Sequence, residues 1–243
     1  MCSVSDDLRK FLANARGSAA SARVLRLDDL QLQLGRPEVD ADASPWGLAA
    51  MRGRLVELSA RGATATLTTA AELVLEAQRA AEPVAWVVPW SLDSRTATFY
   101  PPDVADTGID LAALVVVRAP STIAAARAAE RLLRSGAFGL VVLDFASVDL
   151  EANRAQRLPD QVLGRLVSLA QSHDAAVICL TEKTSEAGSL GSLVSMRAEA
   201  MRLRQPGSSS ESGFEVTIRA LKDKRRGPGW SKRLKARGPA GMG

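Results

Sequence analysis

The stretch STIAAARAAERLLRSGAFGLVVLD, residues 121–144, contains one complete unit of the fold: a helix, a turn and a strand. The helix is predicted to begin after Pro120 with Ser121 as its cap and to end at Gly136, because glycine tolerates the backbone of a helix end. The strand is the continuous apolar run Leu140–Asp144. An apolar run without alternation is typical of a strand that is buried on both faces.

Similar units lie on both sides of this stretch. Further apolar runs occur at 55–58, 84–88, 114–117 and 175–180, and helical patterns occupy roughly 67–81 and 158–172. Residues 214–221 alternate between polar and apolar, which predicts a later, antiparallel strand after the turn-forming segment 205–213. The sequence therefore predicts an α/β protein with a mostly parallel, twisted sheet that has helices on both faces.

The composition agrees with a globular chain. Its 243 residues, of which 47% are apolar, suit one large domain with extensions or two small ones. No apolar run approaches the roughly 18 residues of a membrane helix, and the N-terminus lacks the apolar stretch of a secretory signal. Cys2, Cys179 and His173 are too far apart to indicate a disulfide framework or a metal site. We therefore expect a soluble cytoplasmic protein without a metal.

The charge is unevenly distributed. From Lys222 onward the chain has eight basic residues and one acidic residue, a net charge of +7. Because the whole chain has a net charge of +4, the residues before Lys222 have a net charge of −3. A basic end indicates nucleic acid or an acidic protein as a partner, although a solvated, disordered end explains it about equally well.

The N-terminus has an amphipathic pattern. Val4, Leu8, Phe11 and Leu12 have the spacing of one helix face, and residues 23–27, Arg-Val-Leu-Arg-Leu, follow as a candidate strand. An isolated helix of this length is marginal in water, so its apolar face must pack on another subunit or on RecA, which is favoured, or back on the core of its own chain.

Five segments resemble bacterial RecA, in the same order along the chain. Residues 133–144 resemble the end of a helix and the Walker B strand, and the other four are the N-terminal strand 23–27, the strand 54–58, the loop 109–114 and the segment 221–224. The resemblance spans about residues 8–228 and implies a RecA-like core.

The nucleotide site of that family is degenerate in this sequence. A phosphate loop needs Gly-x-x-x-x-Gly-Lys-Ser/Thr, because bare amides surround the phosphates and a lysine neutralises them. Here Ala60 and Ala65 replace the glycines, Thr66 replaces the lysine and Leu67 replaces the magnesium-binding hydroxyl. Trp90 stands where the resemblance places the catalytic glutamate. Asp144 of the Walker B strand remains, and we expect it to be a structural residue at a strand end. The sequence therefore predicts no catalysis and no nucleotide cofactor.

The two DNA-binding loops of RecA also look shortened, at 145–157 and 183–192. The second has one basic residue and no aromatic one. Single strands are usually bound by basic grooves and stacking rings, so RecA-like strand exchange is not expected.

A RecA-like core without a phosphate loop resembles the ImuA family, together with the related SulA-type proteins. The resemblance implies an adaptor in damage-induced, LexA-controlled translesion synthesis, with an ImuB-type protein, an error-prone polymerase and RecA as partners. A SulA-like inhibitor of the cell-division GTPase and a divergent ATPase are the alternatives. The long N-terminal extension favours the adaptor over the SulA-like protein, and the missing lysine and glycines disfavour the ATPase.

The expected organisation has three parts. Residues 1–35 form a helix and strand that bind a second copy of the chain or RecA, residues 36–221 form the core, and residues 222–243 form a flexible basic tail. The N-terminal interface would use Leu8, Phe11, Leu12, Val24 and Leu25. The tail would contact a partner or single-stranded DNA through Lys222, Lys224, Arg225, Arg226, Trp230, Lys232 and Arg233, although Trp230 could equally cover the sheet locally, and solvation is slightly favoured for Lys222 and Lys224.

Overall fold

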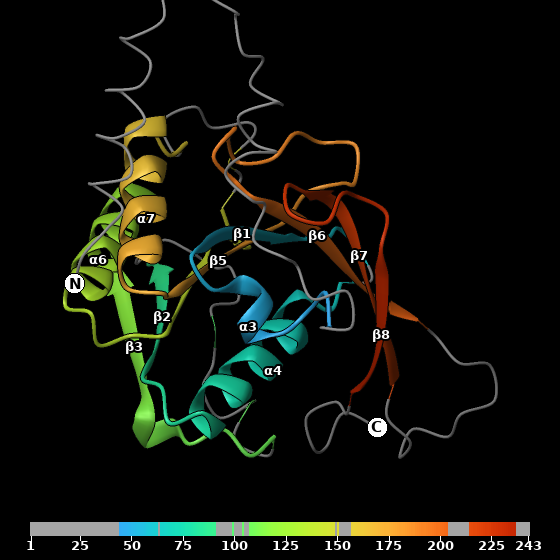
Figure 1. Cartoon of the computed structure of the whole chain (residues 1–243), viewed down its shortest axis with the longest axis horizontal. Coiled ribbons are helices and arrows are strands. Elements are labelled where there is room, and N and C mark those ends of the chain that lie inside the picture. The colour runs from blue at the N-terminus through green and yellow to red at the C-terminus, as the bar shows by residue number, and fades with distance from the viewer. Residues whose placement is uncertain are drawn as a thin grey trace, which may run out of the picture. The chain divides into compact units, whose positions relative to one another are not determined.

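A computed structural model describes residues 44–62, 64–90, 99, 104, 107–148, 150, 157–203 and 214–236. Within these ranges, eight strands form one mixed sheet in the order β3-β2-β4-β5-β1-β6-β7-β8 (Figure 1). The strands are β1 (Arg54–Ser59), β2 (Val84–Pro89), β3 (Leu114–Ala119), β4 (Leu140–Asp144), β5 (Ala176–Thr181), β6 (Met196–Leu203), β7 (Phe214–Asp223) and β8 (Ser231–Ala236). The pairings from β3 to β6 are parallel, whereas β7 is antiparallel to both β6 and β8.

The helices that the structure describes connect the parallel strands. They are α3 (Leu48–Met51), α4 (Thr66–Arg79), α6 (Thr122–Arg134) and α7 (Asp160–Ser172), together with the 3-10 turn η1 (Leu111–Ala113). Ser121 caps α6 as predicted, since its hydroxyl accepts a hydrogen bond of 3.1 Å from the amide of Ala124. Gly136 follows this helix with a φ of 70°, the left-handed backbone for which glycine is suited.

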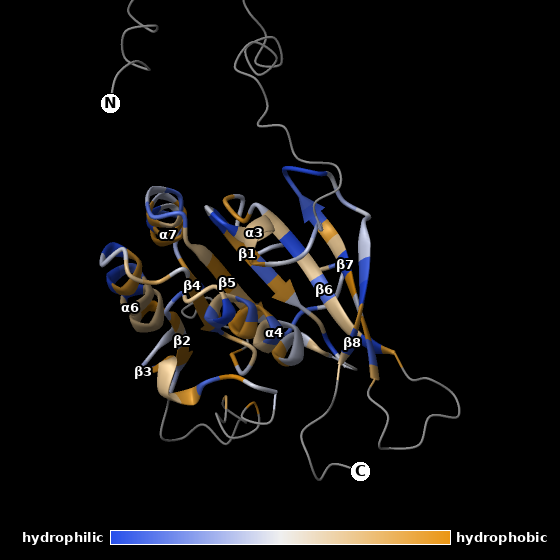
Figure 2. Cartoon of the chain, turned by 60° about the horizontal axis from the view of Figure 1, so that its bottom comes forward, coloured by the Kyte–Doolittle hydropathy of each residue, from blue (hydrophilic) through white to orange (hydrophobic). Residues whose placement is uncertain are grey.

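Helices cover both faces of the parallel part of the sheet. Successive side chains of a strand point to opposite faces, so Val56 and Leu58 pack on the side of α3 and α4 while Leu55 packs on the side of α6 and α7. Figure 2 shows these central strands as predominantly hydrophobic. The prediction of an α/β fold with a mostly parallel sheet between helices is confirmed.

The antiparallel part is covered differently. Residues of β6, β7 and β8 such as Ala198, Ile218 and Ala236 belong to the core on the side of α3 and α4. Among the described residues, no member of these three strands belongs to the core on the side of α6 and α7. The three strands therefore bury one face, which explains why β7 and β8 alternate in sequence.

The prediction of a flexible tail from residue 222 is wrong for residues 222–236. The expected boundary between core and tail lies inside β7, and Ser231–Ala236 forms β8 on the edge of the sheet. A strand forms because Leu234 and Ala236 reach the core while Arg233 and Lys235 stay exposed. Gly227 and Gly229 have φ values of 85° and 97° in the connecting turn. The high glycine and basic content concealed this alternation.

The expected N-terminal helix 4–16 and strand 23–27 lie outside the described residues. All described residues belong to one unit, 42–243, and residues 1–41 are separate from it. None of the helices in the described ranges has the length and hydropathy to cross a bilayer.

Candidate functional site

The carboxyl ends of the parallel strands meet at one edge of the sheet, where α/β proteins usually bind ligands. The six residues 60–65 connect the end of β1 to the start of α4 at this edge. Thr66, which stands at the position of the phosphate-binding lysine in the RecA resemblance, is the first residue of α4. The candidate loop therefore lies between strand and helix, where a phosphate loop would lie.

The backbone of this connection is bound by the chain itself. The amide of Ala65 donates to the carbonyl of Ala200 in β6 over 3.0 Å, and Thr64 forms an isolated bridge with Met201. The amide of Thr66 donates to the hydroxyl of Thr64 over 3.2 Å. Amides that already have acceptors are not free to surround a phosphate.

Most side chains of the connection are uncharged, and its one charged side chain, Arg61, lies beside a carboxylate. Ala60 and Ala65 are buried, and Ala65 is part of the core beside α4. The hydroxyl of Thr66 is 3.1 Å from that of Thr64, while Leu67 is exposed. Arg61 is exposed and lies 3.8 Å from the carboxylate of Glu182. The loop is therefore closed and largely apolar.

Asp144 ends β4 and is buried on the same side of the sheet as α4. Its Oδ2 atom accepts a hydrogen bond of 3.2 Å from the indole of Trp86, and its Oδ1 atom accepts one of 3.2 Å from the amide of Ala146. Trp86 in turn stacks on Phe99, with ring centroids 4.1 Å apart. Burial raises the pKa of Asp144, although both hydrogen bonds oppose this shift. Asp144 acts here as an acceptor for a core tryptophan.

Trp90 follows β2 and is partly exposed. Its amide donates to the carbonyl of Ala119 over 2.6 Å, which holds it beside the end of β3. The guanidinium of Arg118 lies 5.1 Å from the centroid of its ring, within the range of a cation–π interaction. An indole cannot accept a proton from a water molecule as a carboxylate does.

Glu57 is a buried charge that sequence reasoning missed as a functional residue. Its carboxylate pairs with the ammonium of Lys183 at 3.0 Å and accepts hydrogen bonds from the Thr181 hydroxyl at 2.9 Å and the Leu190 amide at 2.8 Å. The signal was present, because Glu57 interrupts an otherwise apolar strand, and a buried carboxylate needs a partner.

This network attaches the loop after β5 to the sheet. Arg197 of β6 donates to the carbonyls of Thr184 and Ala187 in the same loop and, over 3.1 Å, to the hydroxyl of Ser59. The segment in which the RecA resemblance places a DNA-binding loop is therefore fixed by two buried charged residues. The arrangement stabilises one conformation of residues 183–190.

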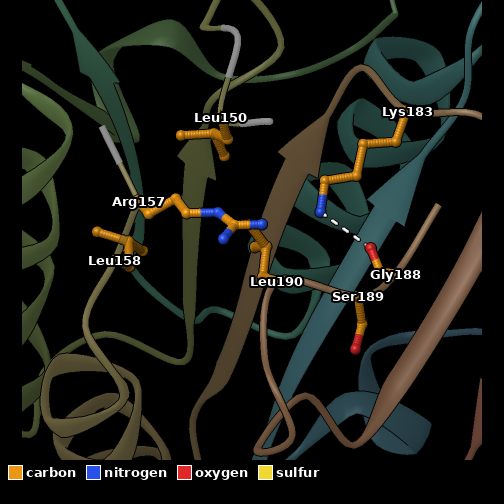
Figure 3. A pocket seen from close by; sticks show the side chains of 7 residues that line it. All are labelled: Leu150, Arg157, Leu158, Lys183, Gly188, Ser189 and Leu190. Carbon is orange, nitrogen blue, oxygen red and sulfur yellow. Dashed lines mark hydrogen bonds between the residues drawn. The ribbon is translucent and has the colours of Figure 1, made fainter. Parts of the chain in front are cut away.

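A small pocket of about 80 Å³ lies beside this loop, and Figure 3 shows its lining. The ammonium of Lys183 points to the carbonyl of Gly188, 3.2 Å away, and Arg157 extends toward Leu190 from the opposite wall. The remaining lining residues are Leu150, Leu158 and Ser189.

Most basic residues expected to form a free tail have contacts within the chain. Lys224 donates to the carbonyl of Ser192 over 2.8 Å, Arg225 to that of Arg52 over 3.1 Å, and Lys232 to that of Trp46 over 3.1 Å. Arg226 also has an interaction partner.

Two further tail residues lie beside other parts of the chain. Arg233 lies 3.4 Å from Glu215, and the ammonium of Lys222 lies 3.5 Å from the Ser189 hydroxyl. Burial, with the neighbouring charge of Lys224, lowers the pKa of Lys222.

Trp230 covers the sheet locally, as one of its two interpretations predicted. It packs against the core beside α3 and α4, and its indole donates to Asp223 over 3.1 Å. The same carboxylate pairs with Arg54 at 2.6 Å, and both side chains are buried. The tail is therefore bound to the central strand β1.

Some predicted features are not described. The N-terminal interface residues Leu8, Phe11, Leu12, Val24 and Leu25 lie outside the described residues. Within the described part of the chain, no group of three or more His, Cys, Asp or Glu residues is arranged to hold a metal ion.

Comparisons with known proteins assign no family. No protein-family model matches the chain, and a search of curated proteins finds no match. The resemblance to RecA and ImuA therefore rests on the five segments and on the degenerate phosphate loop alone.

Proposed function

We propose that this protein is a non-catalytic, RecA-like adaptor in SOS-induced translesion DNA synthesis. In this role it links or regulates an ImuB-type protein, an error-prone polymerase and RecA. The proposal combines two arguments: the nucleotide position is closed by the chain itself, and the four RecA-like segments that the structure describes all belong to the same sheet or to the elements that enter it.

The closed turn between β1 and α4 is the observation that carries the proposal. The Ala65 amide is used by Ala200 and the Thr66 amide by Thr64, so a phosphate would have to compete with existing hydrogen bonds. No lysine stands at the start of α4, and Asp144 already accepts from Trp86. A protein with this edge is better suited to protein contacts than to nucleotide hydrolysis.

The positions of the RecA-like segments in the sheet support the RecA-like part of the proposal. Residues 54–58, 114 and 140–144 lie in β1, β3 and β4 of the same sheet, and residues 221–224 lie at the end of β7, next to the start of β6. In a RecA-related protein that has lost catalysis, the surfaces for partners are what remains of the function. The damage-response role itself comes from the resemblance to ImuA.

The direct test is to purify tagged full-length protein from damaged cells and identify its partners by mass spectrometry. We expect a translesion polymerase and an ImuB-type protein. Recovery of the division GTPase instead would support the SulA-like alternative and contradict the adaptor.

A titration with ATP and magnesium in a calorimeter tests the non-catalytic part. We expect no heat of binding. A dissociation constant in the micromolar range would contradict the closed site and favour the divergent ATPase.

A further inference from the structure

Two exposed apolar side chains mark the carboxyl edge of the sheet. Leu67, in the first turn of α4, is 48% exposed, and Trp90, directly after β2, is 38% exposed. The other large exposed apolar residues in the described ranges are Val115 on β3 and Leu203 on β6. Leu67 and Trp90 are also the positions at which nucleotide chemistry would require a hydroxyl and a carboxylate.

Both side chains belong to the side of the sheet that carries α4. Alternation along β2 places Trp86 in the core on that side, and Trp90 is four residues further along. Arg118, which lies over the ring of Trp90, alternates in the same way with Leu114 and Val116 of β3. The surface between Leu67 and Trp90 therefore runs along one face of the carboxyl edge.

The spacing of the two side chains suits one short segment of a partner. β1 and β2 are separated by β5 and β4, which is three strand spacings or roughly 14 Å. Because the start of α4 is also bonded to β6 through the Ala65 amide, Leu67 lies three to four strand spacings from the end of β2, roughly 14–19 Å. Four turns of a helix extend about 22 Å, so a segment of this length reaches both residues. Leu67 is on a helix and Trp90 directly follows a strand, so little conformational entropy is lost when they are covered.

The charge at this surface selects the chemistry of the segment. Arg118 has no carboxylate partner among the described residues, and Arg61, beyond the end of β1, has only the exposed Glu182 at 3.8 Å. Asp144, the acid at the neighbouring strand end, is buried and turned to Trp86. Tryptophan and arginine are the residue types most often found at binding hot spots between proteins.

We propose that this edge binds an acidic, apolar segment of another protein, with Trp90 and Leu67 as apolar anchors and Arg118 as the partner of a carboxylate. The proposal deepens the proposed function, because the surface is free for a protein once no nucleotide binds there. Single-stranded DNA fits less well, since the edge offers one aromatic ring and an aliphatic anchor where bases need several stacking platforms.

Photo-crosslinking of the full-length protein in cells tests this surface. The variant Trp90→p-benzoylphenylalanine places the reactive group at the edge, and Val115→p-benzoylphenylalanine is a matched control of similar exposure near the amino end of β3. We expect position 90 to give an adduct that maps onto an acidic, apolar segment of another protein, and position 115 not to give it. An adduct with a second copy, with residues 1–43 of this chain or with nucleic acid would overturn the proposal, as would no adduct.

Charge reversal provides the second measurement. Arg118→Glu in the same background should lower the yield of the adduct at least fivefold, whereas Arg219→Glu, an exposed arginine on β7, should leave it within twofold. Equal yields with and without Arg118→Glu would overturn the role of the charge. Thermal melting checks that each variant is folded.

The outcomes separate this proposal from the adaptor function. An adduct on an acidic segment of a division protein would support the edge as a binding surface and contradict the role in translesion synthesis. Co-purification of the polymerase without any adduct at position 90 would contradict the edge and leave the adaptor function in place.

Discussion

Asp144 and Asp223 occupy corresponding places in the parallel and antiparallel parts of the sheet. Each is the last residue of its strand, each is 5% exposed, and each accepts a hydrogen bond from an indole, at 3.2 Å from Trp86 and 3.1 Å from Trp230. They differ in the cation: Arg54 lies 2.6 Å from Asp223, whereas Asp144 has no basic partner among the described residues.

The pKa values of the two carboxyls move in opposite directions. Burial raises the pKa of Asp144, and its two hydrogen bonds compensate only in part. Burial also opposes the charge of Asp223, but hydrogen bonds from the Arg225 amide, Arg54 and Trp230 together lower its pKa. Asp223 is therefore one half of a buried ion pair with Arg54, which we call the clamp. Asp144, at the Walker B-like position, is a hydrogen-bond acceptor for the core residue Trp86, which we call the cap.

The largest effect is expected for Asp223→Ala. The substitution leaves the guanidinium of Arg54 buried without a counter-charge, which typically costs about 3–5 kcal/mol of the free energy of unfolding. Urea denaturation followed by circular dichroism measures it. Asp174→Asn is the control, because the carboxylate of Asp174 is mostly exposed at 3.7 Å from Arg52 and should contribute below about 1 kcal/mol, and asparagine tolerates the φ of 50° at this position. Equal losses for both variants would contradict the clamp.

A smaller loss is expected at Asp144. Asp144→Ala leaves the indole of Trp86 buried without its acceptor, at a cost of about 1–3 kcal/mol. Asp144→Asn keeps the acceptor for Trp86 and removes a buried charge, but it loses the acceptor for the Ala146 amide, so the free energy of unfolding should change by less than for Asp144→Ala. If the asparagine variant were destabilised as strongly as Asp223→Ala, the distinction between cap and clamp would be wrong.

The pH dependence should separate the two carboxyls further. Asp223 has a lowered pKa in the folded protein, so its stabilisation is present above the ordinary aspartate pKa of about 3.9 and is lost as the pH falls through the folded value. Asp144 has a raised pKa, so its charge destabilises the fold at pH values above the folded pKa, and acid relieves this cost.

Denaturation between pH 7 and pH 4 tests the linkage. The gain in stability of Asp144→Asn relative to the natural protein should shrink as the pH falls through this window, while the loss caused by Asp223→Asn should persist down to about pH 4. A pH-independent difference for Asp144→Asn would show that its pKa is not raised.

No effect on ATP binding is expected when two residues of the phosphate-loop consensus are restored. The double substitution Ala65→Gly with Thr66→Lys supplies two consensus residues, yet the amide at position 65 still donates to the carbonyl of Ala200 and Asp144 still accepts from Trp86. Calorimetry with ATP and magnesium should therefore show no binding. Micromolar binding would mean that the missing residues alone, and not the closed backbone, prevent it.

Continuous apolar runs made the parallel strands predictable. The run 84–88, for example, corresponds to β2, Val84–Pro89. A strand that is buried on both faces is apolar at nearly every position, so it can be recognised from its own residues alone. β6 was not predicted, since Met196–Leu203 has one buried face and contains alanine, glutamate and methionine, which do not favour strands. β8 was missed for a similar reason, as half of its residues are basic.

The site was only partly predictable. The degenerate loop could be located because a phosphate loop has a fixed spacing, and Thr66 does begin α4. The partners of Glu57 and Arg54 could not be found, because they are 126 and 169 positions away in sequence and meet only through the strand order. No local pattern encodes such a contact.

The large separation of Arg54 and Asp223 in sequence also means that Arg54 is synthesised well before its partner. A ribosome adds about 5–20 residues per second, so the 169 positions between them take roughly 8–34 s to translate. The neighbours of β1, which are β5 and β6, are synthesised within that interval, but the guanidinium in the central strand still has no counter-ion. The native sheet therefore becomes complete only after Asp223 has been added, and a nascent chain that stops before Asp223 carries an unneutralised charge at its centre.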